Sequence, residues 1–168
     1  IWITGGQSNM DGFGKLINTE PPSKQVHALY FDDNWDTAAD PLCWYNESID
    51  PVHWSEEAPM QRRDAARQDR QLRKQGAGPA VSFGKTIFQD TGVPIGLVVC
   101  SHGGTSMSQW APERLSEGGA SLYGSMIRRA NLAGGKVTGV IWYQGESDAN
   151  GENQALYKER MRDLVMSM

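Results

Sequence analysis

Three short apolar runs recur along the chain, and each is followed by small or polar residues and then by a helical pattern. The runs span residues 1–3, 95–100 and 137–143, and helices are predicted over 79–90, 122–133 and 152–165. Apolar runs of this length fit buried strands of a parallel sheet, and the helices between them fit the crossover connections of βα units. The pattern therefore predicts an α/β sandwich, with an open sheet covered by helices.

The segment from about 15 to 77 does not fit this rhythm. It is polar, contains five prolines and carries Trp35, Trp44, His53 and Trp54. Loops of this length are uncommon unless they serve a site. We predict an insertion beside the binding cleft, with residues 60–75 as a short helix. A surface excursion without a role is the alternative, and in either case the length favours one domain over residues 1–168.

Charge and composition narrow the possible partners. The 168 residues carry a net charge of −4, and the basic residues are scattered apart from the 62–74 stretch, so nucleic acid and anionic membranes are not expected partners. No run approaches 18 consecutive apolar residues. Cys43 and Cys100 have no metal-binding spacing, and we expect both to be buried thiols. The chain begins without Met and its end has the pattern of a helix interior, so we expect a longer parent sequence.

The first strand leads directly into residues 5–10, Gly-Gly-Gln-Ser-Asn-Met. Ligands bind at the carboxyl ends of parallel strands, and a glycine-rich turn lets a side chain project there. Ser8 could attack an acyl carbon if a base removed its proton, and its own N–H could help to hold the oxyanion. Two alternatives stay open from this segment alone: Ser8 caps the following helix, or the turn binds phosphate.

Two further polar segments follow the second and third strands. In residues 101–106 (Ser-His-Gly-Gly-Thr-Ser), Gly104 could supply a second oxyanion donor or simply form a turn with positive φ. Trp110, shortly beyond, could stack on a sugar or pack in the core. In residues 142–149, Gln144 could donate to an oxyanion and Glu146 could orient a histidine. Alternatively, both cap the next helix or bridge loops.

Taken together, three motifs in this order resemble one branch of the SGNH hydrolases, that of the sialate O-acetylesterases and the family-six carbohydrate acetylesterases. They are Gly-Gln-Ser-Asn-Met at 6–10, Gly-Gly-Thr at 103–105 and Trp-Tyr-Gln-Gly-Glu-Ser at 142–147, with further matches at 78–79, 83–84, 110 and 122–123. The resemblance covers the chain from end to end except for the segment 15–77. It implies a flavodoxin-like three-layer α/β/α fold.

The resemblance also implies roles for particular residues. Ser8 would be the nucleophile, Glu146 the acidic member of the triad, and Ser8, Gly104 and Gln144 the oxyanion partners. Candidates for the substrate pocket are Asn9, His102 and Trp110.

The chain departs from the family pattern in its histidines. Family members carry the catalytic histidine in a late Asp-x-x-His motif, whereas this chain has only His27, His53 and His102. Asp50 and His53 have that spacing, but they lie in the early segment. We therefore expect the histidine, with the C-terminal part of the fold, to lie beyond residue 168. Without it, only the oxyanion hole and substrate binding would remain to accelerate the reaction.

The expected function is that of a serine esterase that removes O-acetyl or similar small acyl groups from carbohydrate, such as sialic acid or xylan, through an acyl-serine. No metal or organic cofactor is required for this chemistry, and the resemblance favours a secreted or periplasmic location. The rival interpretation is a carbohydrate-binding relative that has lost catalysis. A nucleotide-binding protein is disfavoured, because neither a P-loop lysine nor a G-x-G-x-x-G motif with a downstream acid is found.

Overall fold

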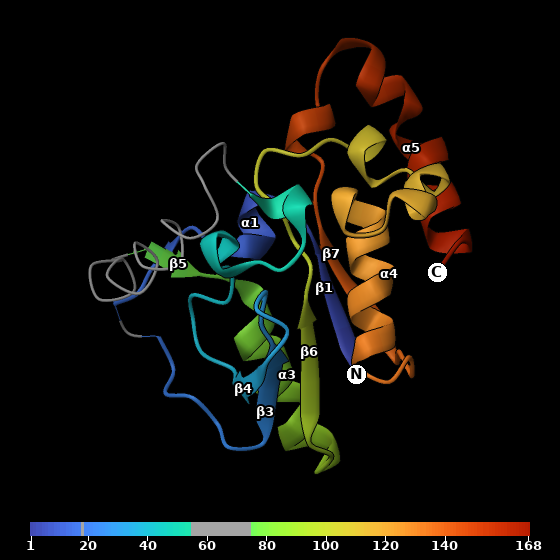
Figure 1. The fold of residues 1–168 in the computed structure, drawn as a ribbon. Coiled ribbons are helices and arrows are strands. Elements are labelled where there is room, and N and C mark those ends of the chain that lie inside the picture. The colour runs from blue at the N-terminus through green and yellow to red at the C-terminus, as the bar shows by residue number, and fades with distance from the viewer. Residues whose placement is uncertain (18, 55–74) are drawn as a thin grey trace.

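The computed structural model describes residues 1–17, 19–54 and 75–168. Within these ranges a five-stranded sheet with the order β4-β3-β6-β1-β7 forms the centre of the protein (Figure 1). The strands are β1 (Trp2–Gly6), β3 (Val26–Leu29), β4 (Trp35–Thr37), β6 (Ile95–Val99) and β7 (Gly139–Tyr143). Neighbouring strands are parallel except that β4 runs antiparallel to β3. The predicted α/β fold with a mostly parallel sheet is confirmed.

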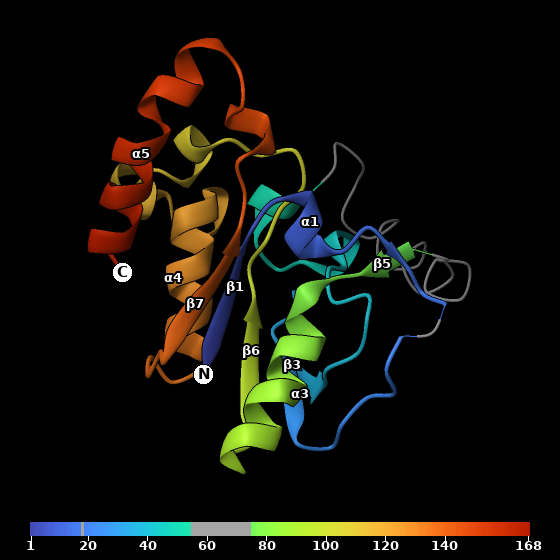
Figure 2. The ribbon, with the colours of Figure 1, turned by 180° about the vertical axis from the view of Figure 1, so that it is seen from behind.

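Helices cover both faces of the sheet, as Figures 1 and 2 show from opposite sides. The helices are α1 (Ser8–Asp11), α3 (Pro79–Thr91), α4 (Leu122–Leu132) and α5 (Gly151–Met166), with 3₁₀ segments at Tyr45–Glu47, Pro51–His53, Met107–Trp110, Pro112–Ala120 and Glu146–Asp148. A small antiparallel pair, β2 (Gly14–Lys15) and β5 (Gln75–Ala77), lies apart from the main sheet. Helix α3 packs on one face of the sheet and α4 and α5 on the other.

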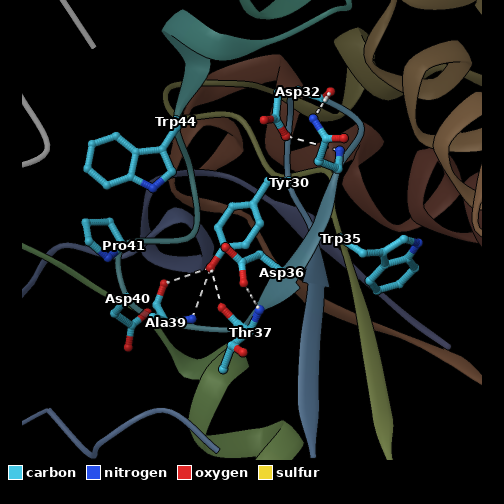
Figure 3. A pocket seen from close by; sticks show the side chains of 10 residues that line it. Tyr30, Asp32, Trp35, Asp36, Thr37, Ala39, Asp40, Pro41 and Trp44 are labelled. Atoms are coloured by element: carbon cyan, nitrogen blue, oxygen red, sulfur yellow. Dashed lines mark hydrogen bonds between the residues drawn. The ribbon is translucent and has the colours of Figure 1, made fainter. Parts of the chain in front are cut away.

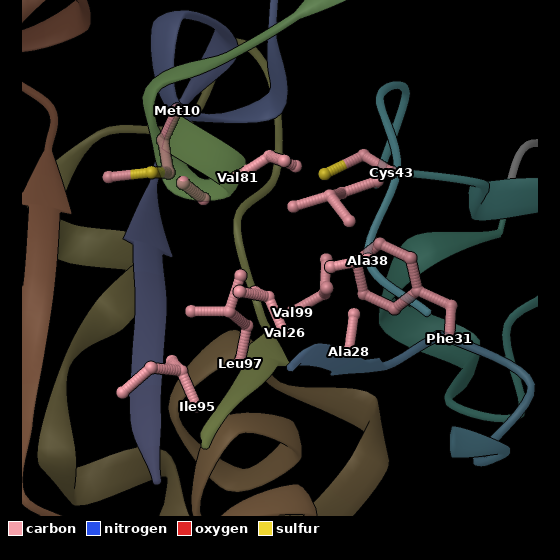
Figure 4. Packing of buried hydrophobic residues seen from close by; sticks show 12 residues of the cluster. Met10, Val26, Ala28, Phe31, Ala38, Cys43, Val81, Ile95, Leu97 and Val99 are labelled. Carbon is pink, nitrogen blue, oxygen red and sulfur yellow. The ribbon is translucent and has the colours of Figure 1, made fainter. Parts of the chain in front are cut away.

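The two layers of core follow from the alternation of side chains along β6. Leu97 and Val99 point into the cluster beneath α3, which Figure 4 shows, whereas Val98 points into the cluster beneath α4. Both faces of this central strand are buried, which explains why its sequence is continuously apolar.

The two long crossover helices have their ends fixed by local sequence. Helix α3 starts with Pro79 in its first turn and stops at Gly92, which adopts a left-handed conformation with φ of 68°. Helix α4 is capped by Ser121, whose side chain accepts a hydrogen bond from the backbone N–H of Gly124 at 3.0 Å. The predicted helices over 79–90, 122–133 and 152–165 agree with the structure to within one residue at every end.

The segment 15–77 is not wholly an insertion, and the structure corrects that prediction. Residues 26–37 supply β3 and β4, and β3 pairs in parallel with β6. Phe31 and Ala38, which follow in this segment, are fully buried. The strand was missed because only four residues form it and exposed His27 interrupts its apolar run. Most of the short helix predicted over 60–75 lies outside the described residues; its last residue, Gln75, begins β5.

Both cysteines are buried and free of disulfide bonds, which confirms the prediction for Cys43 and Cys100. None of the helices in the described ranges has the length and apolar character needed to cross a bilayer.

Candidate active site

The three motifs meet at the edge formed by the carboxyl ends of β1, β6 and β7. The backbone N–H of Gln7 donates to the carbonyl of Tyr143 at 2.9 Å, and that of His102 donates to the carbonyl of Gly6 at 2.9 Å. Gly6 has φ of 129°, and a Cβ atom there would lie 2.1 Å from the Tyr143 carbonyl oxygen. The turn after β1 therefore requires glycine, because it is bonded tightly between its two neighbours.

Ser8 is the first residue of α1 and is half-buried at this edge. It does not cap the helix, because Gln7 occupies the N-cap position. Among the described residues, neither the Ser8 hydroxyl nor its backbone N–H has a hydrogen-bond partner. Both groups remain available to a ligand.

The Gly103–Gly104 loop lies beside Ser8. A Cβ atom built on Gly103 would be 3.8 Å from the Ser8 Cβ. Gly104 is exposed and has φ of 72°, so the turn with positive φ is present. No described residue accepts from the Gly104 backbone N–H. Two unpartnered N–H groups, from Ser8 and Gly104, therefore border the same edge.

A partly buried tyrosine, Tyr45, joins the serine helix to this loop. The Gly103 N–H donates to the Tyr45 hydroxyl oxygen at 2.7 Å, and the hydroxyl donates to a carboxylate oxygen of Asp11, the last residue of α1. Burial raises the pKa of the Asp11 carboxyl and of the Tyr45 hydroxyl. Neither residue belongs to the motifs that predicted the site. Tyr45 lies in the segment that we took for an insertion, and Asp11 directly follows the first motif, which is the one signal that could have drawn attention to it.

Glu146 reaches the site through its contact with the residue after Ser8. The Asn9 side-chain amide donates to a carboxylate oxygen of Glu146, which is exposed at the start of a 3₁₀ segment. The Gln7 side-chain oxygen accepts from the backbone N–H of Ser147 at 3.2 Å. The first and third motifs are thus linked by side chains as well as by backbone.

Gln144 makes contacts inside the protein. Its amide nitrogen donates to the Thr105 carbonyl at 3.0 Å and to a carboxylate oxygen of Asp148 at 2.5 Å. Since these bonds use both of its N–H groups, the oxyanion role of Gln144 stays a prediction. The same Asp148 oxygen accepts from the Met107 N–H at 2.9 Å. Asp148 is 1% exposed and was missed by the sequence analysis, although it lies in the third motif.

The histidines near the site form a pair, in which His53 is buried and His102 is half-buried. The Nδ1 atoms of His53 and His102 are 2.9 Å apart, and the His102 ring stacks on Tyr45 with centroids 4.6 Å apart. Burial lowers the pKa of both histidines, which favours neutral rings. Among the described residues, no hydrogen bond joins a histidine to Ser8. The role of His102 and Asn9 in lining a substrate pocket stays a prediction.

Trp110 is not a wall of the site, which corrects its place among the pocket candidates. Its side chain is 0% exposed, and its indole N–H donates to the Thr105 hydroxyl at 3.0 Å. The ring packs edge-on against Trp142. A fully buried ring offers no face to a sugar, so Trp110 supports the loop from the core.

The described residues contain no group of three or more His, Cys, Asp and Glu side chains placed to hold a metal ion. The fold and this edge together define an α/β protein with a serine-bearing turn set against a glycine loop, an arrangement that suits acyl transfer. The comparisons with known proteins agree with that class. Residues 1–168 match the model of the family described as carbohydrate esterase, sialic acid-specific acetylesterase, and the chain belongs to this family.

A probable carbohydrate esterase of Arabidopsis thaliana is 31% identical over 180 residues, which cover 100% of this chain and 62% of the relative. The chain thus spans under two thirds of that relative's length. A crystal structure of an Arabidopsis thaliana protein matches 98% of the chain and 66% of its own, with a TM-score of 0.70 and 26% identity.

Two more distant structures share the fold. A carbohydrate acetylesterase from Xanthomonas citri has a TM-score of 0.56 and 24% identity, over 98% of this chain and 36% of its own. NanS has a TM-score of 0.62 and 16% identity, over 99% of this chain and 60% of its own.

Proposed function

We propose that the complete protein is a serine esterase that removes O-acetyl or similarly small acyl groups from carbohydrate. One observation carries the proposal: the Ser8 hydroxyl, the Ser8 N–H and the Gly104 N–H lie at one edge without partners among the described residues. A nucleophile and two oxyanion donors are the groups that acyl transfer needs in one place. Membership of a carbohydrate esterase family supports the choice of reaction.

The reaction would proceed by double displacement. The Ser8 oxygen attacks the ester carbonyl carbon, and the N–H groups of Ser8 and Gly104 hold the resulting oxyanion. Collapse of the tetrahedral intermediate expels the sugar hydroxyl, which takes up the proton lost by Ser8. Water then attacks the acetyl-serine, releases acetate and returns the proton to Ser8.

A general base must take the proton from the Ser8 hydroxyl. That base would be a histidine outside residues 1–168, as the family resemblance implies. Glu146 would orient that histidine and stabilise its charge. Its exposure and its bond to Asn9, the neighbour of Ser8, support this role.

Gln144 would act chiefly by positioning. It holds the Thr105 carbonyl, and through it the end of the Gly103–Gly104 loop. Direct donation to the oxyanion would require Gln144 to release Thr105 or Asp148 when substrate binds.

The proposed substrates are acetylated carbohydrates, with sialic acid and xylan as the two candidates. A second candidate function is a carbohydrate-binding relative without catalysis. It is favoured by one observation, the lack of a hydrogen bond between Ser8 and a histidine in the described part of the chain.

Hydrolysis of p-nitrophenyl acetate tests the proposal. The chain extended through its natural downstream sequence would be compared with its Ser8→Ala variant and with Ser82→Ala, which changes an exposed serine of α3. We expect Ser8→Ala to lower kcat by at least about 10⁴-fold and Ser82→Ala to leave it unchanged. An acetylated Ser8 peptide, trapped by rapid acid quench and detected by mass spectrometry, would identify the intermediate.

If the extended protein is inert towards this ester and towards acetylated sugars, the catalytic proposal fails. The binding relative then takes its place.

A further inference from the structure

A separate cavity of about 380 Å³ lies on the flank of the sheet, around the edge strand β4 (Figure 3). This volume falls within the range of small-molecule sites, roughly 300–1,000 Å³. The cavity is lined by three aromatic residues, Tyr30, Trp35 and Trp44, and by three acidic ones, Asp32, Asp36 and Asp40. Neither its position nor its lining belongs to the edge that carries Ser8.

Hydrogen bonds hold the Tyr30 ring in the cavity wall. The Tyr30 hydroxyl accepts from the Ala39 N–H at 3.1 Å and donates to the Thr37 carbonyl at 3.1 Å, so its ring is fixed across the hairpin. Figure 3 shows the Tyr30 and Trp44 rings above the strip formed by Ala39, Asp40 and Pro41. Ordered rings of this kind offer apolar contact area at little entropic cost.

The acidic side keeps acceptor capacity. Asp36 accepts from the Thr37 N–H at 2.6 Å, and Asp40 accepts from the Gly78 N–H at 3.3 Å, both through Oδ1. No described residue donates to Oδ2 of either carboxylate. An ionised carboxylate only accepts hydrogen bonds, and such bonds from hydroxyl groups are short and strong.

We propose that this cavity binds a neutral, hydroxyl-rich sugar unit, as an accessory carbohydrate site beside the proposed active site. A pyranose has an apolar C–H face for the part-exposed Tyr30 ring and hydroxyl groups for the carboxylates, whereas Trp44 is only 7% exposed and the Trp35 ring points away from Tyr30 (Figure 3). An anionic sugar such as sialic acid is excluded, because its carboxylate would face Asp32, Asp36 and Asp40. Only the choice of carbohydrate as the ligand rests on the proposed function.

The position of the cavity fits one unit of a longer glycan. Strand β4 is three strands away from β1 in the sheet, a separation of roughly 14 Å at the usual strand spacing. Trp44, in the cavity wall, directly precedes Tyr45, which is bonded to the loop beside Ser8. A chain of sugars could therefore occupy the cavity while an acetylated unit lies at Ser8.

The experiment uses the extended chain with Ser8→Ala, so that binding is measured without turnover. Xylotetraose is the neutral probe, with N-acetylneuraminic acid and spermidine as anionic and cationic probes. Binding is followed by ¹H–¹⁵N NMR, including the indole N–H signals of Trp35 and Trp44. We expect xylotetraose to shift signals of residues 30–44, and the two charged probes to leave them unchanged.

Variants then assign the contacts. Asp36→Asn, at an exposed position, and the double variant Asp36→Asn with Asp40→Asn should weaken xylotetraose binding, the double variant by at least about tenfold, since charge-assisted bonds are lost. Asp90→Asn, on the exposed end of α3, should bind as the parent does.

The proposal is overturned if shifts occur only around Ser8 and Gly104, if spermidine or N-acetylneuraminic acid binds in the cavity instead, or if the Asn variants bind xylotetraose as tightly as the parent. Because this binding needs no catalysis, a protein that fails as an esterase but shows the expected shifts would retain the cavity site. Esterase activity without the expected shifts would rule out the cavity site and leave the proposed active site intact.

Discussion

The Ser8 edge and the β4 flank of the sheet are built by different means. At the Ser8 edge, the turns after β1, β6 and β7 are bonded to one another by backbone and by motif side chains, as in the bond between Gln7 and Tyr143. On the β4 flank, the Tyr30 hydroxyl bonds across the hairpin, Arg129 binds the turn through Asp33, and buried Phe31 and Ala38 anchor it in the core. The Ser8 edge is assembled from three short motifs that lie far apart in the sequence, whereas the cavity wall comes from one stretch, residues 30–44.

The largest expected effect comes from breaking the tight contact at the Ser8 edge. In Gly6→Ala, the new methyl group would meet the Tyr143 carbonyl at 2.1 Å, on a backbone with φ of 129°. We expect a loss of at least about 4 kcal/mol in the free energy of unfolding, measured by urea denaturation.

The matched control is Gly92→Ala, where φ is 68° and the added Cβ atom meets nothing within 4 Å. Backbone strain alone should cost about 1–2 kcal/mol there. If the two alanine variants were equally stable, close packing would not distinguish the Ser8 edge from an ordinary helix end.

The sequence reveals the Ser8 edge because its chemistry lies in three contiguous motifs, each placed directly after an apolar strand. Parallel strands bring their carboxyl ends together, so sequence order alone predicted that these motifs meet. The bonds that hold the motifs were harder to predict. Tyr45 contacts Asp11 and Gly103 across 34 and 58 positions of the chain, and no local pattern marks such contacts.

The flank was poorly predicted for a physical reason. Strand β3 buries only Val26, Ala28 and Leu29, too few residues for periodicity to separate it from a loop. The prediction of Trp110 as a pocket residue was wrong, since the residue is buried. An aromatic residue after a loop has the same sequence signature whether it faces a ligand or the core. Burial, which decides between these cases, depends on tertiary contacts.

An effect of intermediate size is expected at Tyr45, whose hydroxyl forms a bridge between α1 and the Gly103–Gly104 loop. Its substitution tests whether this bridge serves catalysis. Tyr45→Phe removes the acceptor of the Gly103 N–H and the donor to Asp11. We expect a cost of about 1–3 kcal/mol in unfolding free energy, since two partly buried polar groups lose their partner. In the extended, active protein, kcat for p-nitrophenyl acetate should fall about 10- to 100-fold, because the Gly104 N–H is less well placed.

Tyr123→Phe is the control for this experiment, since Tyr123 donates from α4 to the Ser167 carbonyl, away from the site. It should lose stability without losing kcat. A Tyr45→Phe enzyme with unchanged kcat and unchanged KM would show that the bridge is structural only, and that the difference between the two regions does not extend to catalysis.

The smallest expected effect is on the pH dependence of stability and concerns Asp40 on the β4 flank. Burial raises the pKa of the Asp40 carboxyl from 3.8 to about 6, so the folded protein holds this proton more tightly than the unfolded chain does. The resulting stabilisation is complete below pH 3.8 and is lost as the pH rises through about 6. At neutral pH the ionised carboxylate therefore costs stability, as expected of a group kept for binding.

Asp40→Asn should remove that cost, because the amide is uncharged and its oxygen can still accept from the Gly78 N–H. We expect the variant to gain on the order of 1 kcal/mol at pH 7.5 and little at pH 4, a modest value because solvent reaches the carboxylate. Urea unfolding at several pH values measures this, with Asp90→Asn giving the effect of losing one surface charge. If Asp40→Asn were instead less stable than the parent at pH 7.5, the ionised carboxylate would be a structural part of the hairpin and not a group kept for binding.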